Sequence, residues 1–453
     1  MLKNILQEKL ILPLSDFLTG QSVSKYLKFF LSSKDWPRER IDDFQNERLR
    51  KLIEYAYEYV PFYHDTMVER GLTPKDIQTK DDLCKLPIIN KEVMRREGIE
   101  RFTSTAMPRS KMIKMSSSGS TGQPFEYYAT RLCYSVNLAA NLRGWYNFGW
   151  RLGDKYVKIS QNPRKSFIKR LQDRITGCLY IATADLSDEH LHEIMQQIEK
   201  YKPVVIRSYP DPLFLMAQYR LKHKDEFSYS PKVLTTTGNV LHSNVRATIE
   251  EAFGCRIFDA YASEGNSNVF ECVSHLGYHS SEEYGITEVV DDDGNPIDSG
   301  VGRLVTTDLW NYAHPFIRYD VQDSVEIDSE PCSCGNRHLR IKRILGRDNE
   351  LLVAPSGRRY TVHHFTVFFE STVTPELKDS IDQFQFVQHK DGTTTLNIVV
   401  NDRYSPSVGK YLEDYWSNEF GAAVAVNVVD RISIMGNNKR RFVIIENANN
   451  CRI

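Results

Sequence analysis

The chain has 453 residues, enough for two or three domains, and its 41% hydrophobic and 26% charged residues are typical of a globular protein. A formal net charge of −1 provides no bulk attraction for a nucleic acid, so we expect no nucleic-acid partner. Eight cysteines are too few for a disulfide framework in a chain of this length, and we expect a cytoplasmic enzyme with reduced thiols.

Residues 1–100 are expected to be helical. The first stretch, "MLKNILQEKLILPLSDFL", is interrupted by charges at Lys3, Glu8 and Lys9 and is too short to span a membrane. Further on, "FQNERLRKLIEYAYEYVPFYHDTM" has apolar residues at helical spacing, and Pro61 is expected to interrupt that helix.

From about residue 110 the pattern changes to alternating strands and helices. Amphipathic runs at 188–201 and 242–253 predict helices between β-rich runs at 111–115, 155–160, 203–209, 232–238 and 256–262. This alternation predicts an α/β fold with a largely parallel sheet. From about 282, strand-rich sequence with turns at Asp293-Gly294 and Ser299-Gly300 predicts an antiparallel or barrel-like part. After "ILGRDNE" (344–350), a small α+β domain is expected.

The stretch "KMSSSGSTGQP" (114–124) lies between two β-like runs, and its residues 116–122 are all serine, threonine or glycine. Such a loop offers backbone N–H groups and hydroxyls to an anion, and its glycines let the backbone approach closely. It is no Walker A loop, because no Gly-Lys-[Ser/Thr] ends it. On its own, a flexible surface loop is the commoner explanation.

Five motifs in order resemble those of adenylate-forming enzymes, the acyl-CoA synthetase superfamily. They are "SSSGSTGQP", "AYASEGN" (260–266), "PFIRYDVQD" (315–323), "GRDNE" (346–350) and "NNKRRF" (437–442). The closer resemblance is to the phenylacetate–CoA ligase-like branch, and within it to members for capsular polysaccharide biosynthesis. "LRKLIEYAYEYVPFYHDTM", "DIQTKDDLCKLPIINKEVMR" and "ECVSHLGYH" carry that likeness.

The resemblance implies the fold of an AMP-forming ligase in two domains. The large N-terminal domain, 1–345, would comprise a helical part (1–100), an α/β core (101–280) and a β-rich, zinc-bearing part (281–345). The small, mobile C-terminal domain would be 346–453. In the first half-reaction a carboxylate attacks the α-phosphate of ATP, which gives an acyl-adenylate and pyrophosphate. In the second, an acceptor displaces AMP.

The resemblance also implies roles for the matched residues. Glu264 would bind Mg²⁺, Ser263 would lie by the α-phosphate, and Lys439 would bridge the carboxylate and the α-phosphate. Tyr261 would stack on adenine, although a packed aromatic is its plainer reading, and the plainer reading of Lys439 is a solvated basic cluster. Asp323 would bind the ribose and Arg347 the nucleotide. The β- and γ-phosphates would be held by Ser117, Ser118, Gly119, Ser120, Thr121 and Gly122.

The chain departs from the family pattern at several positions. Asn239 stands where relatives often have glutamate, and Asn349 occupies the usual position of the hinge aspartate. Gln322 and Asn438 replace glycines, and asparagine tolerates the left-handed backbone region that such positions favour. We interpret the set as divergence within an active family, with a slow or unusual ligase as the alternative.

A second group of residues resembles a structural zinc site. "CVSH" supplies Cys272 and His275, and "CSCG" supplies Cys332 and Cys334 about sixty residues later. Thiolates and imidazole suit tetrahedral zinc, and His279 is the rival fourth ligand. Cys-x-Cys is tighter than the usual knuckle, and two unrelated thiol clusters are the alternative; the resemblance to this branch favours zinc.

The acyl pocket is less well determined. "NLRGWYNFGWRLGD" (141–154) is expected near the carboxylate, with Arg143 to pair with an anionic group, and Tyr209 and Asn239 as further wall residues; core packing is the alternative for each. The basic–apolar stretch "RKSFIKRLQDRITG" (164–177) could contact the inner face of a membrane as a peripheral site, or form a solvated helix face.

Three functions fit these observations. The first is a ligase of capsular or surface polysaccharide biosynthesis that passes the acyl group to an amine or hydroxyl on a sugar. The second makes an acyl- or aryl-CoA, with CoA as the acceptor. The third is a nucleotide-binding scaffold without turnover, against which the intact loop, Glu264, Asp323 and Lys439 argue. The sequence identifies neither the carboxylate nor the oligomeric state.

Overall fold

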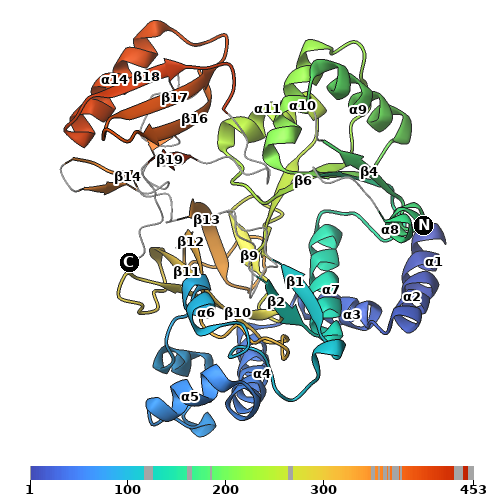
Figure 1. Ribbon diagram of the computed structural model, residues 1–453. Helices are drawn as coiled ribbons and strands as arrows, with labels where there is room; N and C mark the ends of the chain where they lie inside the picture. Colours follow the sequence, from blue (N-terminus) through green and yellow to red (C-terminus); the bar gives the residue numbers. More distant parts are fainter. Residues whose placement is uncertain are drawn as a thin grey trace.

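The computed structural model describes residues 2–116, 126–160, 166–183, 186–263, 269–347, 352–355, 358–360, 365, 368–369, 377, 380–432 and 442–446. Figure 1 shows the helices of residues 38–97 at the bottom of the molecule, the first two helices at the right, and the C-terminal strands at the top left. No helix in these ranges has the length and apolar character needed to cross a membrane.

The first hundred residues are helical, as the sequence predicts. Pro61 does interrupt the long helix: α4 ends at Tyr59 and α5 begins at Pro61, because proline lacks the N–H that a first helical position leaves unused. The helices are α1 (Leu2–Leu6), the π-helical η1 (Gln7–Ile11), α2 (Leu12–Thr19), α3 (Val23–Ser33), α4 (Arg38–Tyr59), α5 (Pro61–Glu69) and α6 (Lys91–Glu97). Short 3₁₀ turns are η2 (Pro74–Asp76), η3 (Lys80–Lys85) and η4 (Arg109–Lys111).

Within the described residues, eleven strands form one sheet in the order β10-β11-β12-β13-β9-β8-β7-β6-β5-β3-β4. The parallel half comprises β3 (Tyr156–Ser160), β4 (Cys178–Ala182), β5 (Val205–Ser208), β6 (Val233–Thr237) and β7 (Ile257–Tyr261). The antiparallel half comprises β8 (Val269–Glu271), β9 (Tyr278–Ser280), β10 (Gly285–Val290), β11 (Gly300–Asp308), β12 (Tyr319–Ile327) and β13 (Arg340–Arg347). The antiparallel part that was expected from residue 282 therefore continues the parallel sheet.

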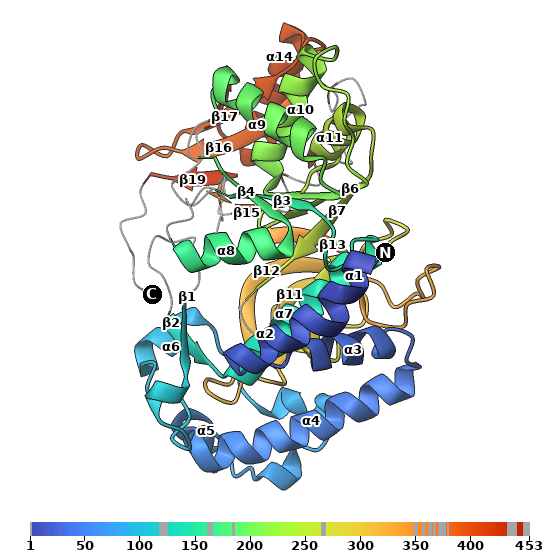
Figure 2. The ribbon, with the colours of Figure 1, turned by 90° about the vertical axis from the view of Figure 1, so that its right-hand side faces the viewer.

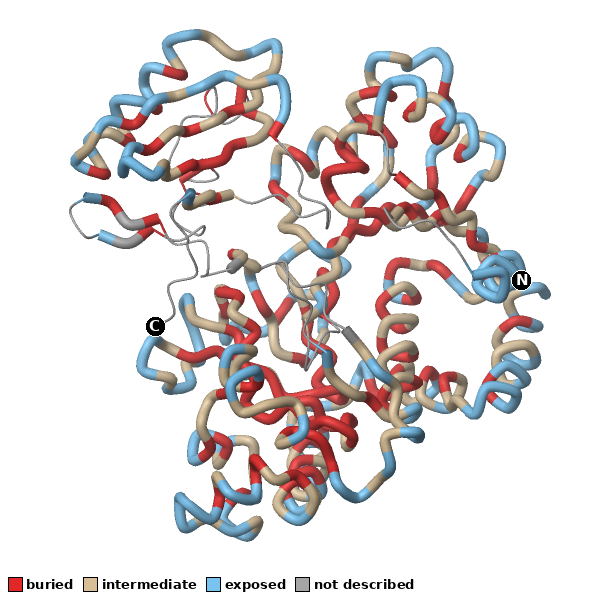
Figure 3. The backbone as a smooth tube through the Cα atoms, in the orientation of Figure 1, coloured by how far each residue is buried: buried red, intermediate tan, exposed pale blue. Residues whose placement is uncertain are grey.

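Helices cover both faces of the parallel half. Figure 2 shows α9 (Asp188–Tyr201), α10 (Pro210–Lys222) and α11 (Ser243–Phe253) on one face, and α7 (Arg131–Asn147) and α8 (Phe167–Thr176) on the other. Burial on both faces explains the continuous apolar runs of these strands. One core cluster packs β3, β5, β6 and β7 against α9–α11, and a second packs α3–α5 and α7 against the antiparallel half. Figure 3 shows the buried residues concentrated along the sheet.

The C-terminal part has its own sheet and core. Its strands β16 (Ile381–Gln388), β17 (Thr394–Val400), β18 (Val424–Val428) and β19 (Val443–Ile445) form a sheet with α14 (Pro406–Phe420), and β14 (Leu352–Val353) pairs with β15 (Arg359–Tyr360). The third core cluster draws only on residues from Leu352 onward. The domain limit at 345/346 stays a prediction.

This C-terminal unit contacts α10 and α11. The Asn244 side chain at the start of α11 donates to the carbonyls of Ile381 and Asp382, at 3.0 and 3.2 Å. The His242 ring lies 5.1 Å from the ring of Phe442 and 6.3 Å from that of Phe384, measured between centroids. Phe442, three positions after Lys439 in the chain, thus lies against the large unit.

Candidate active site

Several predicted site residues follow the carboxyl ends of neighbouring parallel strands. Ser208 pairs with Thr236, and Thr237 pairs with Ala260, so β5, β6 and β7 end at one edge of the sheet. Tyr209 directly follows β5, and Asn239 and Ser263 are the second residues after β6 and β7. In open α/β sheets, ligands bind at the carboxyl ends of the strands. The structure therefore brings these three residues to the edge where a ligand is expected.

Tyr261 and Asp323, predicted to contact adenine and ribose, meet directly. The Tyr261 hydroxyl donates to Oδ2 of Asp323 at 2.5 Å, although 62 positions separate them in the chain. Asp323 is in turn the register partner of Arg347 across β12 and β13. The backbones of three residues matched to nucleotide binding thus come together. The side chain of Arg347 lies outside the described part of the chain.

Gln322, just before Asp323, adopts a left-handed backbone conformation with φ of +63°. Its N–H donates to Oδ1 of Asp320 at 2.8 Å, which fixes the backbone that presents Asp323. This conformation fits the glycine that the family resemblance implies at the position, since a side chain costs about 1–2 kcal/mol there. Glutamine at position 322 is therefore strained, yet Asp323 keeps its contact with Tyr261.

A second contact at the edge joins the ends of β5 and β6. The Tyr209 ring lies against Gly238, where an added Cβ would come within 2.6 Å of a ring carbon and where φ is +90°. Beside it, the Asn239 amide donates to Oδ2 of Asp211 at 2.8 Å. Tyr209 and Asn239 therefore lie together on the wall expected for the carboxylate substrate, with Asp211 as a neighbour that the sequence did not single out.

Four elements of the expected catalytic machinery lie outside the described residues. They are the loop residues Ser117, Ser118, Gly119, Ser120, Thr121 and Gly122, together with Glu264, Asn349 and Lys439 with Asn438. The loop's two ends are described: β1 (Ile113–Ser116) and β2 (Glu126–Ala129) form an antiparallel hairpin in which Ser116 is opposite Glu126. The roles given to these residues stay predictions.

A buried polar network that sequence reasoning missed supports β6 and β7 below the edge. The Asp259 carboxylate accepts from Thr236 at 2.7 Å and from Tyr278 at 2.9 Å, and burial raises its pKa. Its backbone N–H donates to Glu271 at 2.7 Å, and Glu271 is paired with Arg246 at 2.9 Å. The signal in the sequence was Asp259 itself, an acidic residue inside an apolar strand two positions before Tyr261.

The predicted metal-binding residues do come together, with His279 in place of His275. The ligand atoms of Cys272, His279, Cys332 and Cys334 all lie within 4.8 Å of one another. Cys272 and Cys332 have their sulfur atoms 3.6 Å apart, and Nε2 of His279 lies 3.3 Å from the sulfur of Cys334. Three sulfurs and one imidazole nitrogen converging from two chain segments fit a closed tetrahedral zinc site.

His275, the ligand first expected, faces elsewhere. It lies in a turn with φ of +55°, its Nδ1 is 2.8 Å from Oε1 of Glu271, and its ring stacks on Phe258. His279 is on β9 instead, where it pairs with Arg340 of β13 beside the Cys332–Cys334 turn. The prediction of His275 is therefore corrected to its rival, His279.

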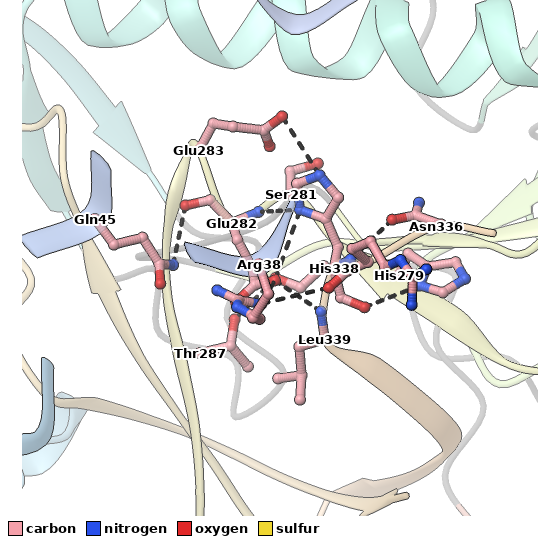
Figure 4. Close-up of polar contacts among 12 residues, drawn as sticks. Arg38, Gln45, His279, Ser281, Glu282, Glu283, Thr287, Asn336, His338 and Leu339 are labelled. Carbon is pink, nitrogen blue, oxygen red and sulfur yellow. Dashed lines mark hydrogen bonds and ion pairs between the residues drawn. The ribbon is translucent and has the colours of Figure 1, made fainter. Parts of the chain in front are cut away.

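A group of polar side chains lies beside His279, as Figure 4 shows. Nδ1 of His279 lies 3.3 Å from the carbonyl oxygen of His338, which leaves Nε2 toward the sulfurs. Burial lowers the pKa of His279 to about 4, so the ring is neutral, as a metal ligand must be. Nearby, Glu282 accepts from Arg38 at 2.7 Å and from the backbone N–H of Leu339 at 2.7 Å.

Arg143, expected in the acyl pocket, is buried beside these polar side chains. Its guanidinium donates to Glu283 at 2.7 Å and to Ser281 at 2.6 Å. Burial alone would raise the pKa of Glu283, but the charges of Arg143 and His338 and the hydrogen bond from Ser33 together hold it below its usual value. The charge of Arg143 is thus matched by an internal carboxylate, and the structure favours a role in holding α7 against the antiparallel half of the sheet.

Known proteins similar to this chain are ligases or capsule-related. No family model matches the chain. It is 28% identical over 394 residues to a phenylacetate-coenzyme A ligase of Thermus thermophilus, with 83% of this chain and 84% of that protein covered. It is 25% identical over 434 residues to protein CapK of Staphylococcus aureus, with 93% of each covered. Among solved structures, 2-hydroxyisobutyryl-CoA ligase in its postadenylation state matches with a TM-score of 0.74 at 17% identity over 91% of each chain.

These similarities confirm three expectations from the sequence. The fold is that of adenylate-forming ligases, with a large mixed sheet and a small C-terminal α/β unit. The resemblance to the phenylacetate–CoA ligase-like branch, including its capsule-related members, is confirmed. With it, the expectation of an AMP-forming ligase is confirmed as well.

Proposed function

We propose that this chain activates a small carboxylate with ATP and Mg²⁺ and transfers the acyl group to an amine or hydroxyl of a sugar during capsular or surface polysaccharide biosynthesis. The observation that carries the proposal is the direct contact of Tyr261 with Asp323 at the carboxyl edge of the parallel strands. Similarity to CapK over 93% of both chains supports the polysaccharide context.

The chemistry requires two displacements at one site. A carboxylate oxygen attacks the α-phosphorus, and pyrophosphate leaves with the electrons of the broken P–O bond. The acceptor nitrogen or oxygen then attacks the acyl carbon, loses its proton, and displaces AMP. Stabilising charge on the phosphates is the main demand of the first step, which suits Lys439, Glu264 with Mg²⁺ and the Ser117–Gly122 loop.

CoA is the second candidate acceptor. Similarity to phenylacetate-coenzyme A ligases, at 28% identity for the Thermus thermophilus protein, favours it. In that case the CoA thiolate attacks the acyl carbon and a thioester is released. Asp211 and Asn239 beside Tyr209 make a polar wall, which favours a carboxylate bearing a hydroxyl or amino group over a plain aryl acid in either case.

The test is pyrophosphate release from ATP and Mg²⁺ with a panel of aryl, amino, hydroxy and uronic acids, each with and without CoA. We expect release with one acid class, loss of release in Asp323→Ala, and no requirement for CoA. If a thioester formed and its formation depended on CoA, the acceptor would be CoA and not a sugar. ATP binding without release for any acid would favour the scaffold.

We further propose that Zn²⁺ occupies the site of Cys272, His279, Cys332 and Cys334 in a structural role. Three thiolates and one neutral imidazole close a tetrahedral shell and leave no position for substrate. The site joins the turn after β8 to the turn before β13, and so stabilises the sheet where its parallel half meets its antiparallel half.

A further inference from the structure

Exposed apolar side chains are concentrated in two segments. Eleven of the eighteen large hydrophobic side chains that the described part of the chain exposes lie in residues 2–18 and in α8. Phe17 and Phe167 are 83% and 72% exposed, and Ile168 is 76% exposed. Single exposed apolar residues are ordinary, but a concentration of this kind marks an interaction surface.

Helix α8 has its apolar face turned outward. Phe167, Ile168, Leu171 and Ile175 share one side at helical spacing, and all four are exposed. Asp173, on the opposite side of the helix, is buried. A surface helix normally buries its apolar side, so this orientation is the inverse of the usual one.

The N-terminal helices show the same inversion. Leu2, Leu6, Leu10, Leu14, Phe17 and Leu18 are exposed, whereas the buried residues of this segment are Gln7 and Asp16. Asp16 accepts from the N–H groups of Val23 and Ser24, at 3.0 and 2.7 Å, and so anchors the start of α3. Polar contacts and the partly buried Leu12 hold these helices, while the six apolar side chains named above stay exposed.

The two inverted segments lie side by side. The Gln7 amide donates to the carbonyl of Ile175, at the end of α8, at 3.0 Å. The N-terminal helix also approaches Gly153 so closely that an added Cβ there would come within 3.3 Å of the backbone of Asn4. Figure 2 shows α8 and α1–α2 on the face turned toward the viewer. Residues 2–18 and α8 together are called the apolar–basic face below.

Charges on this face are sorted by sign. Its basic residues are exposed, and they are Lys3, Lys9, Lys169, Arg170 and Arg174. Its carboxylates are turned inward or paired: Asp16 and Asp173 are buried, and Glu8 accepts from the hydroxyl of Tyr146 at 2.8 Å. A chain with net charge −1 therefore presents a local positive surface around its apolar side chains.

We propose that the apolar–basic face docks the enzyme on an anionic phospholipid bilayer. Leucine and phenylalanine side chains would enter the boundary between headgroups and acyl chains, while the lysines and arginines beside them would pair with lipid phosphates. Charge complementarity favours a lipid surface over a second copy of the chain, because two such faces would repel each other. The proposal rests on this surface alone and is independent of the ligase activity.

The experiment is flotation of the full-length protein with vesicles of phosphatidylcholine alone and with vesicles that also contain phosphatidylglycerol. We expect binding to the anionic vesicles that weakens as salt is raised. Phe167→Ser combined with Ile168→Ser should abolish flotation. Arg170→Gln combined with Arg174→Gln should lower the partition coefficient by about fivefold for each charge removed at low salt.

Matched controls use exposed residues elsewhere. Tyr411→Ser with Val428→Ser removes apolar surface from the C-terminal unit, and Lys224→Gln removes an exposed charge; both should bind like the unaltered protein. Equal flotation of all variants, or no flotation with anionic vesicles, would overturn the proposal. Sedimentation velocity that shows a dimer lost in the Phe167/Ile168 variant, without vesicle binding, would identify the face as a protein interface instead. Pyrophosphate release, measured in parallel, tests the ligase function separately.

Discussion

The Cys/His cluster and the nucleotide edge are built on the same sheet but depend on different kinds of contact. The cluster's four ligand atoms lie within 4.8 Å of one another, and its histidine is already oriented by the carbonyl of His338. At the nucleotide edge, Tyr261 and Asp323 are in contact, while Glu264 and Lys439 lie outside the described residues. In the cluster, four side chains converge on one point, whereas the contact at the nucleotide edge is one hydrogen bond between residues of β7 and β12. The predictions below test this difference.

The largest effect is expected from Lys439→Ala. If the lysine stabilises charge on the α-phosphate only during adenylation, its loss should lower the rate of pyrophosphate release by roughly 10²–10³-fold. Acyl transfer from a chemically supplied acyl-adenylate should change far less, because the lysine is not needed for that half-reaction.

Arg440→Ala is the matched control for Lys439→Ala, since it removes a neighbouring charge of the same basic run. It should retain most of the activity. If both variants lost activity equally, the basic residues 439–441 would act together as a positive surface, and the specific role assigned to Lys439 would be incorrect.

The next largest effect is expected from His279→Ala, on metal content and stability. The unaltered protein should contain one zinc per chain by inductively coupled plasma mass spectrometry. The variant should lose most of it and unfold at a temperature lower by on the order of 5 °C, because the metal joins two segments of the sheet.

His275→Ala provides the comparison for that experiment, because this histidine lies four positions away and contacts Glu271 instead of the cysteines. It should keep its zinc. Zinc loss in His275→Ala with retention in His279→Ala would show that the ligand assignment in the structure is incorrect. If both variants and the unaltered protein contained no zinc, a zinc site would be excluded.

A smaller effect is expected from Tyr261→Phe at the nucleotide edge. Removing the hydroxyl leaves Asp323 without a hydrogen bond of 2.5 Å, which should raise the KM for ATP about fivefold, equivalent to ~1 kcal/mol. The ring remains, so stacking on adenine should persist. Tyr229→Phe removes a hydroxyl that donates at 2.6 Å to Pro203, before the start of β5, and should leave the KM unchanged. A KM unchanged in Tyr261→Phe as well would separate this tyrosine from ATP binding.

The sequence predicted the local elements well. The run 155–160 became β3 (Tyr156–Ser160), and 188–201 became α9 (Asp188–Tyr201), because apolar spacing and β-branched residues report directly on local geometry. Tyr261 and Asp323 were assigned from motifs and lie in contact. Local pattern and motif order were sufficient for these.

What the sequence could not supply depends on how distant segments pack. The choice between His275 and His279 is decided by the pairing of β9 with β13, sixty residues apart. The pattern of α8 showed an amphipathic helix but not that its apolar side faces solvent. Arg143 looked available in the sequence because its partner, Glu283, is 140 positions away. Each requires a long-range contact that no local pattern encodes.

The smallest expected effect concerns Gln322, which presents Asp323 from a strained backbone. With φ of +63°, Gln322→Gly should raise the free energy of unfolding by about 1 kcal/mol, because glycine has no Cβ to oppose this conformation. The gain is reduced by loss of the 3.1 Å hydrogen bond from the Gln322 amide to Glu92.

Gln322→Ala loses the same hydrogen bond and keeps the strain, so the difference in denaturant midpoint between the glycine and alanine variants isolates the free energy of the backbone conformation. If the two variants were equally stable, the left-handed conformation would carry no cost, and glycine in relatives would need another reason, such as close approach of the ribose. A lower KM for ATP in Gln322→Gly would point to that reason directly.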